Sequence, residues 1–272
     1  MNKINLFELF NKKYRNRCPV SYDSRVWLEK SFSLLFEIFD KKKIKQKEIL
    51  IPGSSSFPIK YNGNSQTAFD TLKIVAKQME VEFTEIQLNL YDDGDNAISI
   101  GSSMGGHTFF NSGDSDKGSA GLYWGKQADN KYHIGLERAK LAQPEIMVAT
   151  LAHELAHIKL LGENRIKGND EKLTDLTTVL FGIGIFNANA AFQTIMRINS
   201  RGWRKIGYLT QMEWCYALSL FTFIRNEKTP NWVEHLTLNV KEGFKQGERF
   251  IEDNQDLILP SVRSLRVNNS YV

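Results

Sequence analysis

Hydrophobic positions recur with a helical period in two stretches near the start of the chain. Residues 25–41 and 66–79 carry apolar side chains three or four positions apart, which predicts one helix over each stretch. Over residues 85–91 apolar side chains instead alternate with polar ones, a pattern typical of a half-buried strand. Further short strands, divided by Gly, Ser and Asp loops, are predicted at residues 97–100, 120–124 and 131–136. Two helices and a small sheet are therefore expected here.

The most apolar helix is predicted between Pro144, which suits a first helical turn, and Gly162, a natural stop. Apolar side chains cover every side of this segment, so it is expected to be buried at the centre of a domain. A second apolar helix is predicted over residues 170–181, capped by Asn169 or Asp170. The apolar runs at 179–186 and 215–224 indicate buried helices, and C-terminal helices are expected at residues 209–226, 230–238 and 240–254.

Together these elements predict an α+β fold. In it, a small and mostly antiparallel sheet covers the buried helix, and a largely helical C-terminal half packs around it. No long linker rich in Pro, Gly or Ser divides the chain, although residues 53–58 form a plausible seam. We therefore expect one main domain over residues 61–272, preceded by a helical, basic extension over residues 1–60.

Composition places the chain among ordinary globular proteins. Of its 272 residues, 42% are hydrophobic and 24% are charged, which excludes disordered, collagen-like and disulfide-rich classes. No apolar run reaches the roughly 18 residues that cross a bilayer, and residues 1–17 lack the apolar block of a secretory signal. A cytoplasmic protein without membrane association is expected, with Cys18 and Cys215 as free thiols.

Positive charge is concentrated at the start of the chain. Residues 1–50 hold 12 Lys and Arg against 6 Asp and Glu, whereas the remainder is close to neutral. Short lysine runs at a helix end usually form a solvated face that complements the helix dipole. Because no aromatic platform or basic recognition helix accompanies them, nucleic-acid binding is not expected.

Two histidines one helical turn apart lie inside the apolar helix. His153 and His157 project from the same face, and Glu154 follows His153 at about 100° around the helix axis. Burying three ionisable groups in an apolar helix is costly unless a partner compensates them. A divalent cation supplies that compensation, so the pattern predicts a Zn²⁺ site in which Glu154 reaches a metal-bound water.

A zinc site with an open position for water needs a third protein ligand. Glu171 and Asp175 lie one turn apart on the second helix, so Glu171 could bind the metal while Asp175 accepts the second ring N–H of a histidine ligand. Glu163, six residues after His157, is the rival ligand on a loop. Spacing favours Glu171, although both remain candidates.

The residues from His153 to His157, followed by Glu171 and Asp175, resemble the zincin metallopeptidases of the gluzincin type. The wider stretch over residues 149–209 is similar to a group of uncharacterised bacterial zinc peptidases. The resemblance implies a zincin-like fold and zinc-assisted hydrolysis of a peptide or protein substrate. It also implies that Glu154 is the general base and then carries the proton to the leaving amine.

The same resemblance implies an edge strand that pairs with an extended substrate and a donor that stabilises the tetrahedral oxyanion. Gly121, Leu122 and Tyr123 are the expected substrate-binding strand. Tyr208 is the expected oxyanion donor, with His235 and Tyr216 as weaker candidates.

Two alternatives share these residues. One is a regulatory or peptide-binding protein that keeps the zincin fold and cleaves nothing, against which the presence of Glu154 argues. The other is a zinc amidase acting on a non-peptide carbonyl, because the same base and metal serve both reactions.

Overall fold

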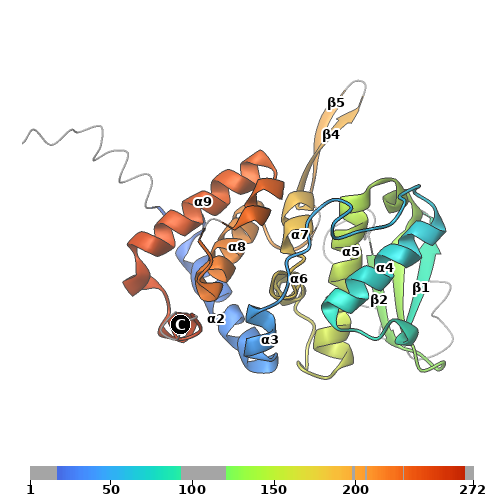
Figure 1. The fold of residues 1–272 in the computed structure, drawn as a ribbon, viewed down its shortest axis with the longest axis horizontal. Helices are drawn as coiled ribbons and strands as arrows, with labels where there is room; N and C mark the ends of the chain where they lie inside the picture. Colours follow the sequence, from blue (N-terminus) through green and yellow to red (C-terminus); the bar gives the residue numbers. More distant parts are fainter. Residues whose placement is uncertain (1–16, 93–120, 198–199, 206, 229, 267–272) are drawn as a thin grey trace, which may run out of the picture. The chain divides into compact units, whose positions relative to one another are not determined.

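The fold is that of a computed structural model, which describes residues 17–92, 121–197, 200–205, 207–228 and 230–266 (Figure 1). It is α+β, as predicted. The chain divides into two compact units. We call Met1–Ile49 with Val179–Val272 the helical unit, and Leu50–Thr178 the sheet unit. The bounds of these two units differ from the domain boundary predicted near residue 60. Because a compact unit is not the same as an independent domain, that boundary stays a prediction.

The helical unit is built from helices and one β-hairpin. Its elements are α2 (Tyr22–Ile38), α3 (Lys41–Lys45), α7 (Gly184–Ala190), β4 (Phe192–Arg197), β5 (Ser200–Lys205), α8 (Gln211–Arg225), η5 (Asn231–His235), α9 (Leu238–Asp253), η6 (Gln255–Leu257) and α10 (Pro260–Arg263). The hydrophobic pattern did not reveal the hairpin, and the apolar run predicted as a helix at residues 179–186 covers only the start of α7. Helix α8 is almost wholly buried and packs against α2, α7 and α9.

Two glycines let α9 approach α8 closely. A Cβ built on Gly243 would lie 2.6 Å from the Cys215 Sγ atom, and one built on Gly247 would overlap the Ser219 side chain, with 3.0 Å between the two Cβ atoms. Gly243 and Gly247 lie one turn apart and are both buried. The close contact between these helices therefore requires that neither position carries a side chain.

We expect Gly247→Ala to destabilise the helical unit by about 1–2 kcal/mol. Overpacking a core costs about 1–3 kcal/mol, and the better helix propensity of Ala returns up to about 1 kcal/mol. Urea unfolding measures the change, with Gly168→Ala as the control because a Cβ at Gly168 meets nothing within 4 Å. A Gly247→Ala protein as stable as the wild type would contradict the close packing.

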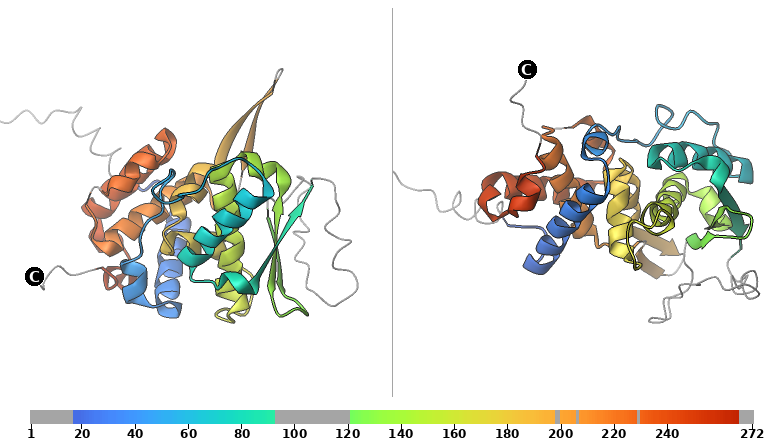
Figure 2. Two further views of the ribbon diagram at one scale, coloured as in Figure 1. Left: turned by 45° about the vertical axis from the view of Figure 1, so that its right-hand side comes forward. Right: turned by 90° about the horizontal axis from the view of Figure 1, so that it is seen from below.

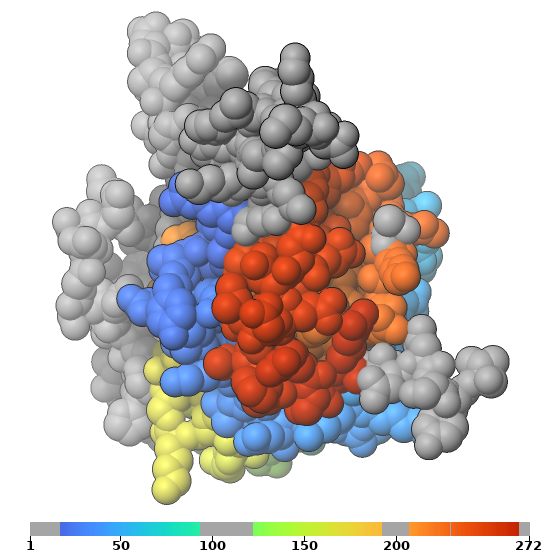
Figure 3. Space-filling view, turned by 90° about the vertical axis from the view of Figure 1, so that its left-hand side faces the viewer, coloured from blue at the N-terminus to red at the C-terminus, as the bar shows by residue number. Residues whose placement is uncertain are grey.

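A buried ionic network ties the C-terminal segment to α2. Glu29 is fully buried, and its carboxylate accepts hydrogen bonds from Arg25 at 3.0 Å, from the Tyr216 hydroxyl at 2.9 Å and from the Leu259 backbone N–H at 2.7 Å. Arg25 also donates to the Leu257 carbonyl oxygen at 2.6 Å. The C-terminal segment, red in Figure 3, accordingly lies beside the blue α2.

The sheet unit holds the predicted strands and the central helix. Its elements are α4 (Ser65–Met79), η1 (Phe83–Glu85), β1 (Ile86–Tyr91), β2 (Gly121–Lys126), β3 (Tyr132–Glu137), η3 (Arg138–Ala142), α5 (Pro144–His157), the π-helical turn η4 (Ile158–Gly162) and most of α6 (Glu171–Leu180). The helix predicted at residues 66–79 and the strand at 85–91 are confirmed. The strand predicted at residues 97–100 lies outside the described residues.

The three strands form a mixed sheet, which corrects the expectation of a mostly antiparallel one. Their order is β1-β3-β2, with β1 parallel and β2 antiparallel to β3. The predicted alternation along β1 is seen at Ile86 and Leu88, which are buried, whereas Leu90 is only partly buried. Strand direction and order depend on the connections, and so the alternation of side chains did not reveal them.

Helix α5 has a buried position in the sheet unit. It packs against α4 and contacts β2 and β3, and Figure 2 shows both helices on one side of the strands. Every residue from Ile146 to His157 is buried except His153, which is partly exposed. The predicted burial of this helix is confirmed.

Two predicted helical runs are interrupted in the structure. The helix expected at residues 25–41 ends at Ile38, and α3 begins after Asp40, whose side chain caps it. The run at residues 179–186 divides after Leu180, because Gly182 has a φ of 77°, a left-handed conformation that favours glycine. Among the described residues, none of the helices combines the length and apolarity needed to cross a membrane.

Candidate metal centre

Both histidines of the candidate site, His153 and His157, lie on α5, as predicted. Pro144 occupies the first turn, and the α-helix extends to His157 before the π-helical turn that ends at Gly162. Single π-helical turns are rare and often lie at functional sites. The rings of His153 and His157 are 4.9 Å apart between centroids and nearly perpendicular. One helical turn therefore brings both imidazoles to the same place.

Helix α6 brings two carboxylates to these histidines. The side chain of Asp170 caps α6 by accepting a hydrogen bond from the backbone of Leu173 at 3.1 Å, which places Glu171 in the first turn. Glu171 Oε2 lies 3.1 Å from Nε2 of His153 and 3.4 Å from Nε2 of His157. One carboxylate oxygen thus faces both imidazoles.

The other nitrogen of each ring has a partner that selects its tautomer. Nδ1 of His153 donates to Oδ1 of the buried Asp175 at 2.8 Å. Nδ1 of His157 lies 3.5 Å from Oγ1 of Thr174, whose own proton is donated to the Asp170 carbonyl oxygen at 3.0 Å. With both Nδ1 atoms protonated, both Nε2 lone pairs are free to bind a cation.

The donor set fits a zinc ion. His153, His157 and Glu171 each offer one ligand atom, and these atoms lie within 4.8 Å of one another. Two tetrahedral ligands at a zinc-nitrogen or zinc-oxygen distance of about 2.1 Å are about 3.4 Å apart, close to the 3.1 and 3.4 Å found between Glu171 and the two imidazoles. Two imidazoles and one carboxylate are also ligands that zinc accepts.

Glu154 supplies a further polar atom without a protein partner. The residue is buried, and its Oε2 atom has no hydrogen-bond partner among the described residues. Burial raises the pKa of Glu154 to about 8, although the neighbouring His153 opposes the shift. A buried carboxyl with an unused oxygen that interacts with His153 needs a water, a cation or a substrate group to satisfy it.

Burial and mutual contacts shift the pKa values of the three candidate ligands. Burial by itself lowers the pKa of His153, but hydrogen bonds to Asp175 and Glu171 outweigh burial and hold that pKa well above its usual range. Burial lowers the pKa of His157. Burial would raise the pKa of Glu171, yet its contacts with the two histidines hold it far below its usual range. Contact with the carboxylates thus favours the charged form of His153 and the ionised form of Glu171, whereas burial favours neutral His157.

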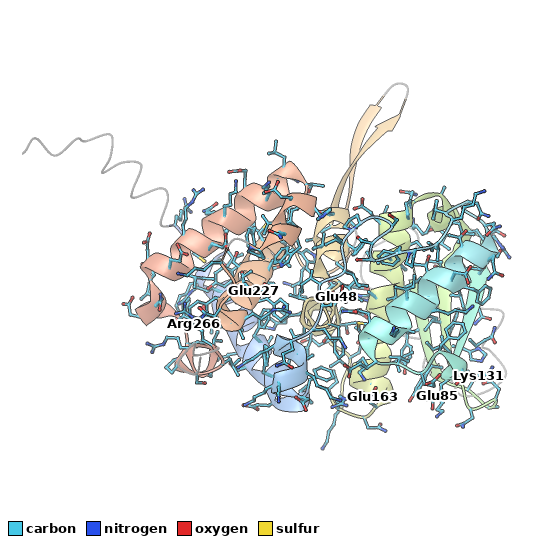
Figure 4. The ribbon with its side chains drawn as sticks, viewed as in Figure 1. Glu48, Glu85, Lys131, Glu163, Glu227 and Arg266 are labelled. Atoms are coloured by element: carbon cyan, nitrogen blue, oxygen red, sulfur yellow. The ribbon has the colours of Figure 1, made fainter. Side chains whose placement is uncertain are left out.

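Glu163 lies away from this cluster. Figure 4 labels Glu163 at the lower end of α5, and both of its carboxylate oxygens form ion pairs, at 2.5 Å with Lys159 and at 2.7 Å with Arg165. Of the two acids proposed from spacing, the structure brings only Glu171 to the histidines. The π-helical turn and the following loop direct Glu163 elsewhere.

The expected substrate-binding strand is β2, which contains Gly121, Leu122 and Tyr123. Among the strands that the structure describes, β2 lies at an edge of the three-stranded sheet, with β3 as its neighbour. The ring of Tyr123 stacks on His157 with centroids 5.4 Å apart and an interplanar angle of 12°. This ring contact, which strand alternation did not predict, joins the strand to the candidate site.

The three candidate oxyanion donors all belong to the helical unit. The Tyr216 hydroxyl is buried and donates a hydrogen bond to Glu29. It therefore contributes to the core of that unit. Tyr208 is half-buried in the turn before α8, and His235 ends η5. The roles of Tyr208 and His235 stay predictions.

Two further residues at the site were missed by the sequence reasoning. Thr174 lies beside His157, and Asn169 donates from its amide Nδ2 to Oε1 of Glu171 at 2.7 Å. Asn169 was considered only as a helix cap, a role that Asp170 takes. The sequence marks these two residues only by their position within three residues of Glu171.

Comparison with known proteins adds no relative. No protein-family model matches the chain, and neither a curated protein nor a solved structure matches it.

Proposed function

We propose that this chain is a zinc-dependent metallopeptidase with a zincin-like fold, acting on a peptide or protein. The observation that carries the proposal is the convergence of Nε2 of His153, Nε2 of His157 and Oε2 of Glu171, with the buried Glu154 interacting electrostatically with this group. Three protein ligands with a carboxylate base beside them are the requirements of a hydrolytic zinc site.

Zinc held by these residues would supply a Lewis acid that polarises a carbonyl and makes water acidic at neutral pH. Glu154 takes the proton from the attacking water and passes it to the nitrogen of the leaving amine. Asp175 keeps the proton of His153 on Nδ1, so that Nε2 stays available as a ligand.

Substrate binding is assigned to β2. An extended peptide pairs with a free strand edge through main-chain hydrogen bonds, and β2 has a strand neighbour on one side only in the described sheet. Because Tyr123 of β2 contacts His157, a peptide paired along Gly121, Leu122 and Tyr123 would pass beside the metal ligands. A peptide substrate is favoured for this reason over a small amide.

Metal content with ligand variants tests the proposal. We expect about one zinc per chain in the wild type, loss of that zinc in His153→Ala, His157→Ala and Glu171→Ala, and its retention in Glu163→Ala. Elemental mass analysis of the purified proteins measures this, together with cleavage of a mixed peptide library before and after chelation.

Each outcome bears on a different part of the proposal. No zinc in the wild type, even after reconstitution at neutral pH, would overturn the metal centre. Zinc bound by the expected ligands without cleavage of any peptide would favour a regulatory protein of the same fold. Zinc lost in Glu163→Ala but retained in Glu171→Ala would replace Glu171 by Glu163 as the third ligand.

A further inference from the structure

The two carboxylate oxygens of Glu171 have different surroundings. Oε2 faces both imidazoles, at 3.1 Å from His153 and 3.4 Å from His157. Oε1 instead accepts a hydrogen bond from Nδ2 of Asn169 at 2.7 Å. Only one oxygen is thus directed at the position where the ligand atoms converge.

The amide of Asn169 is set in one orientation. Its nitrogen faces the carboxylate, because turning the amide over would place two oxygen atoms in contact. Asp170, the next residue, caps α6 through Leu173, which fixes the backbone that carries Asn169. A hydrogen bond to an ionised acceptor is among the stronger ones in proteins.

We propose that Asn169 is a positioning residue that restricts Glu171 to binding zinc through one oxygen, Oε2. This inference rests on the proposed zinc centre. A carboxylate can bind a metal through one oxygen or both, and the Asn169 hydrogen bond keeps Oε1 turned away. The metal then has three protein ligand atoms and keeps an open position for water. Without Asn169, Oε1 is free to become a fourth protein ligand atom beside the bound water, which raises the coordination number from four to five.

Cobalt(II) in place of zinc gives a direct readout. Four-coordinate cobalt(II) absorbs visible light much more strongly than five-coordinate cobalt(II), so absorption reports the coordination number without any reaction. The proteins to compare are the wild type, Asn169→Ala and Asn169→Leu, which keeps the approximate shape of Asn and removes its hydrogen bonds. Lys167→Ala is the matched control, because Lys167 is an exposed residue of the same loop.

We expect each Asn169 variant to bind one cobalt ion and to lose the strong four-coordinate absorption, whereas Lys167→Ala keeps it. With zinc, kcat/KM should fall by about 10–100-fold, the usual effect of removing a group that orients a metal ligand. Circular dichroism of the metal-free proteins separates this effect from unfolding. The side chain of Asn169 is only partly buried, so the metal-free variants should fold as the wild type does.

An unchanged four-coordinate spectrum in both Asn169 variants would overturn the role of Asn169 and leave the metal centre standing. A wild type that binds neither zinc nor cobalt would overturn both the metal centre and this inference. If the spectrum changes as expected but no peptide is cleaved by the wild type, the inference holds and the proposed peptidase reaction fails.

Discussion

Glu154→Gln is expected to reduce peptide hydrolysis by about 100–10,000-fold while zinc stays bound. Positioned general acid-base groups contribute rate factors of this size, and the range equals about 2.7–5.5 kcal/mol of transition-state stabilisation. Glutamine keeps the shape of glutamate but cannot take a proton from water. The measurement is kcat/KM on a cleaved peptide, together with zinc per chain in the same preparation.

Glu145, another glutamate of α5, provides the control for this substitution. Glu145 lies on the same helix, in the exposed first turn, so Glu145→Gln should keep both zinc and activity. If Glu154→Gln retains more than about a tenth of the wild-type kcat/KM, then Glu154 is not the base. Loss of zinc in Glu154→Gln would instead show that the residue supports the metal site.

Zinc is expected to stabilise the wild type by about 4 kcal/mol when its free concentration is about 1,000 times its Kd. The reason is that the two histidines and Glu171 meet only in the folded sheet unit, so the unfolded chain lacks the site. For a chain of this size, that stabilisation corresponds to a rise in Tm of about 10 °C. Thermal unfolding with zinc and with a chelator measures the difference.

His157→Ala should remove this zinc-dependent rise in Tm. His133→Ala is the matched control, since His133 is half-exposed and pairs with Asp129. The rise should also shrink as the pH falls, because protons compete with zinc for the histidine nitrogens. A wild type whose Tm is the same with zinc and with a chelator would contradict a site formed by folding, as would an equal rise in His157→Ala.

Local sequence patterns determined the helices and strands that frame the site. Helical periodicity revealed α4, and the continuous apolar character of the next helix revealed the buried α5. Alternation revealed β1. Each of these patterns depends on residues within a few positions of one another. The pattern itself indicates whether one face of the segment or the whole segment is buried. The pairing of His153 with His157 is of the same kind, because one helical turn brings the two imidazoles together.

Features that depend on distant segments were harder to predict. The parallel pairing of β1 with β3 depends on how the chain between them returns, and side-chain alternation is the same for either direction. The division of the apolar run at residues 179–186 depends on the left-handed conformation of Gly182. Hydrophobicity alone does not distinguish a turn of this kind from a continuous helix.

The sequence by itself determined that His153, Glu154 and His157 share one buried helix and that Glu171 and Asp175 lie one turn apart on another. Only the tertiary structure decided that Glu171, and not Glu163, faces the histidines. It also decided that Tyr123 stacks on His157 and that Asn169 holds Oε1 of Glu171. The physical reason is that helix geometry relates residues within a turn, whereas contacts across a loop or from a strand are set by the packing of whole elements.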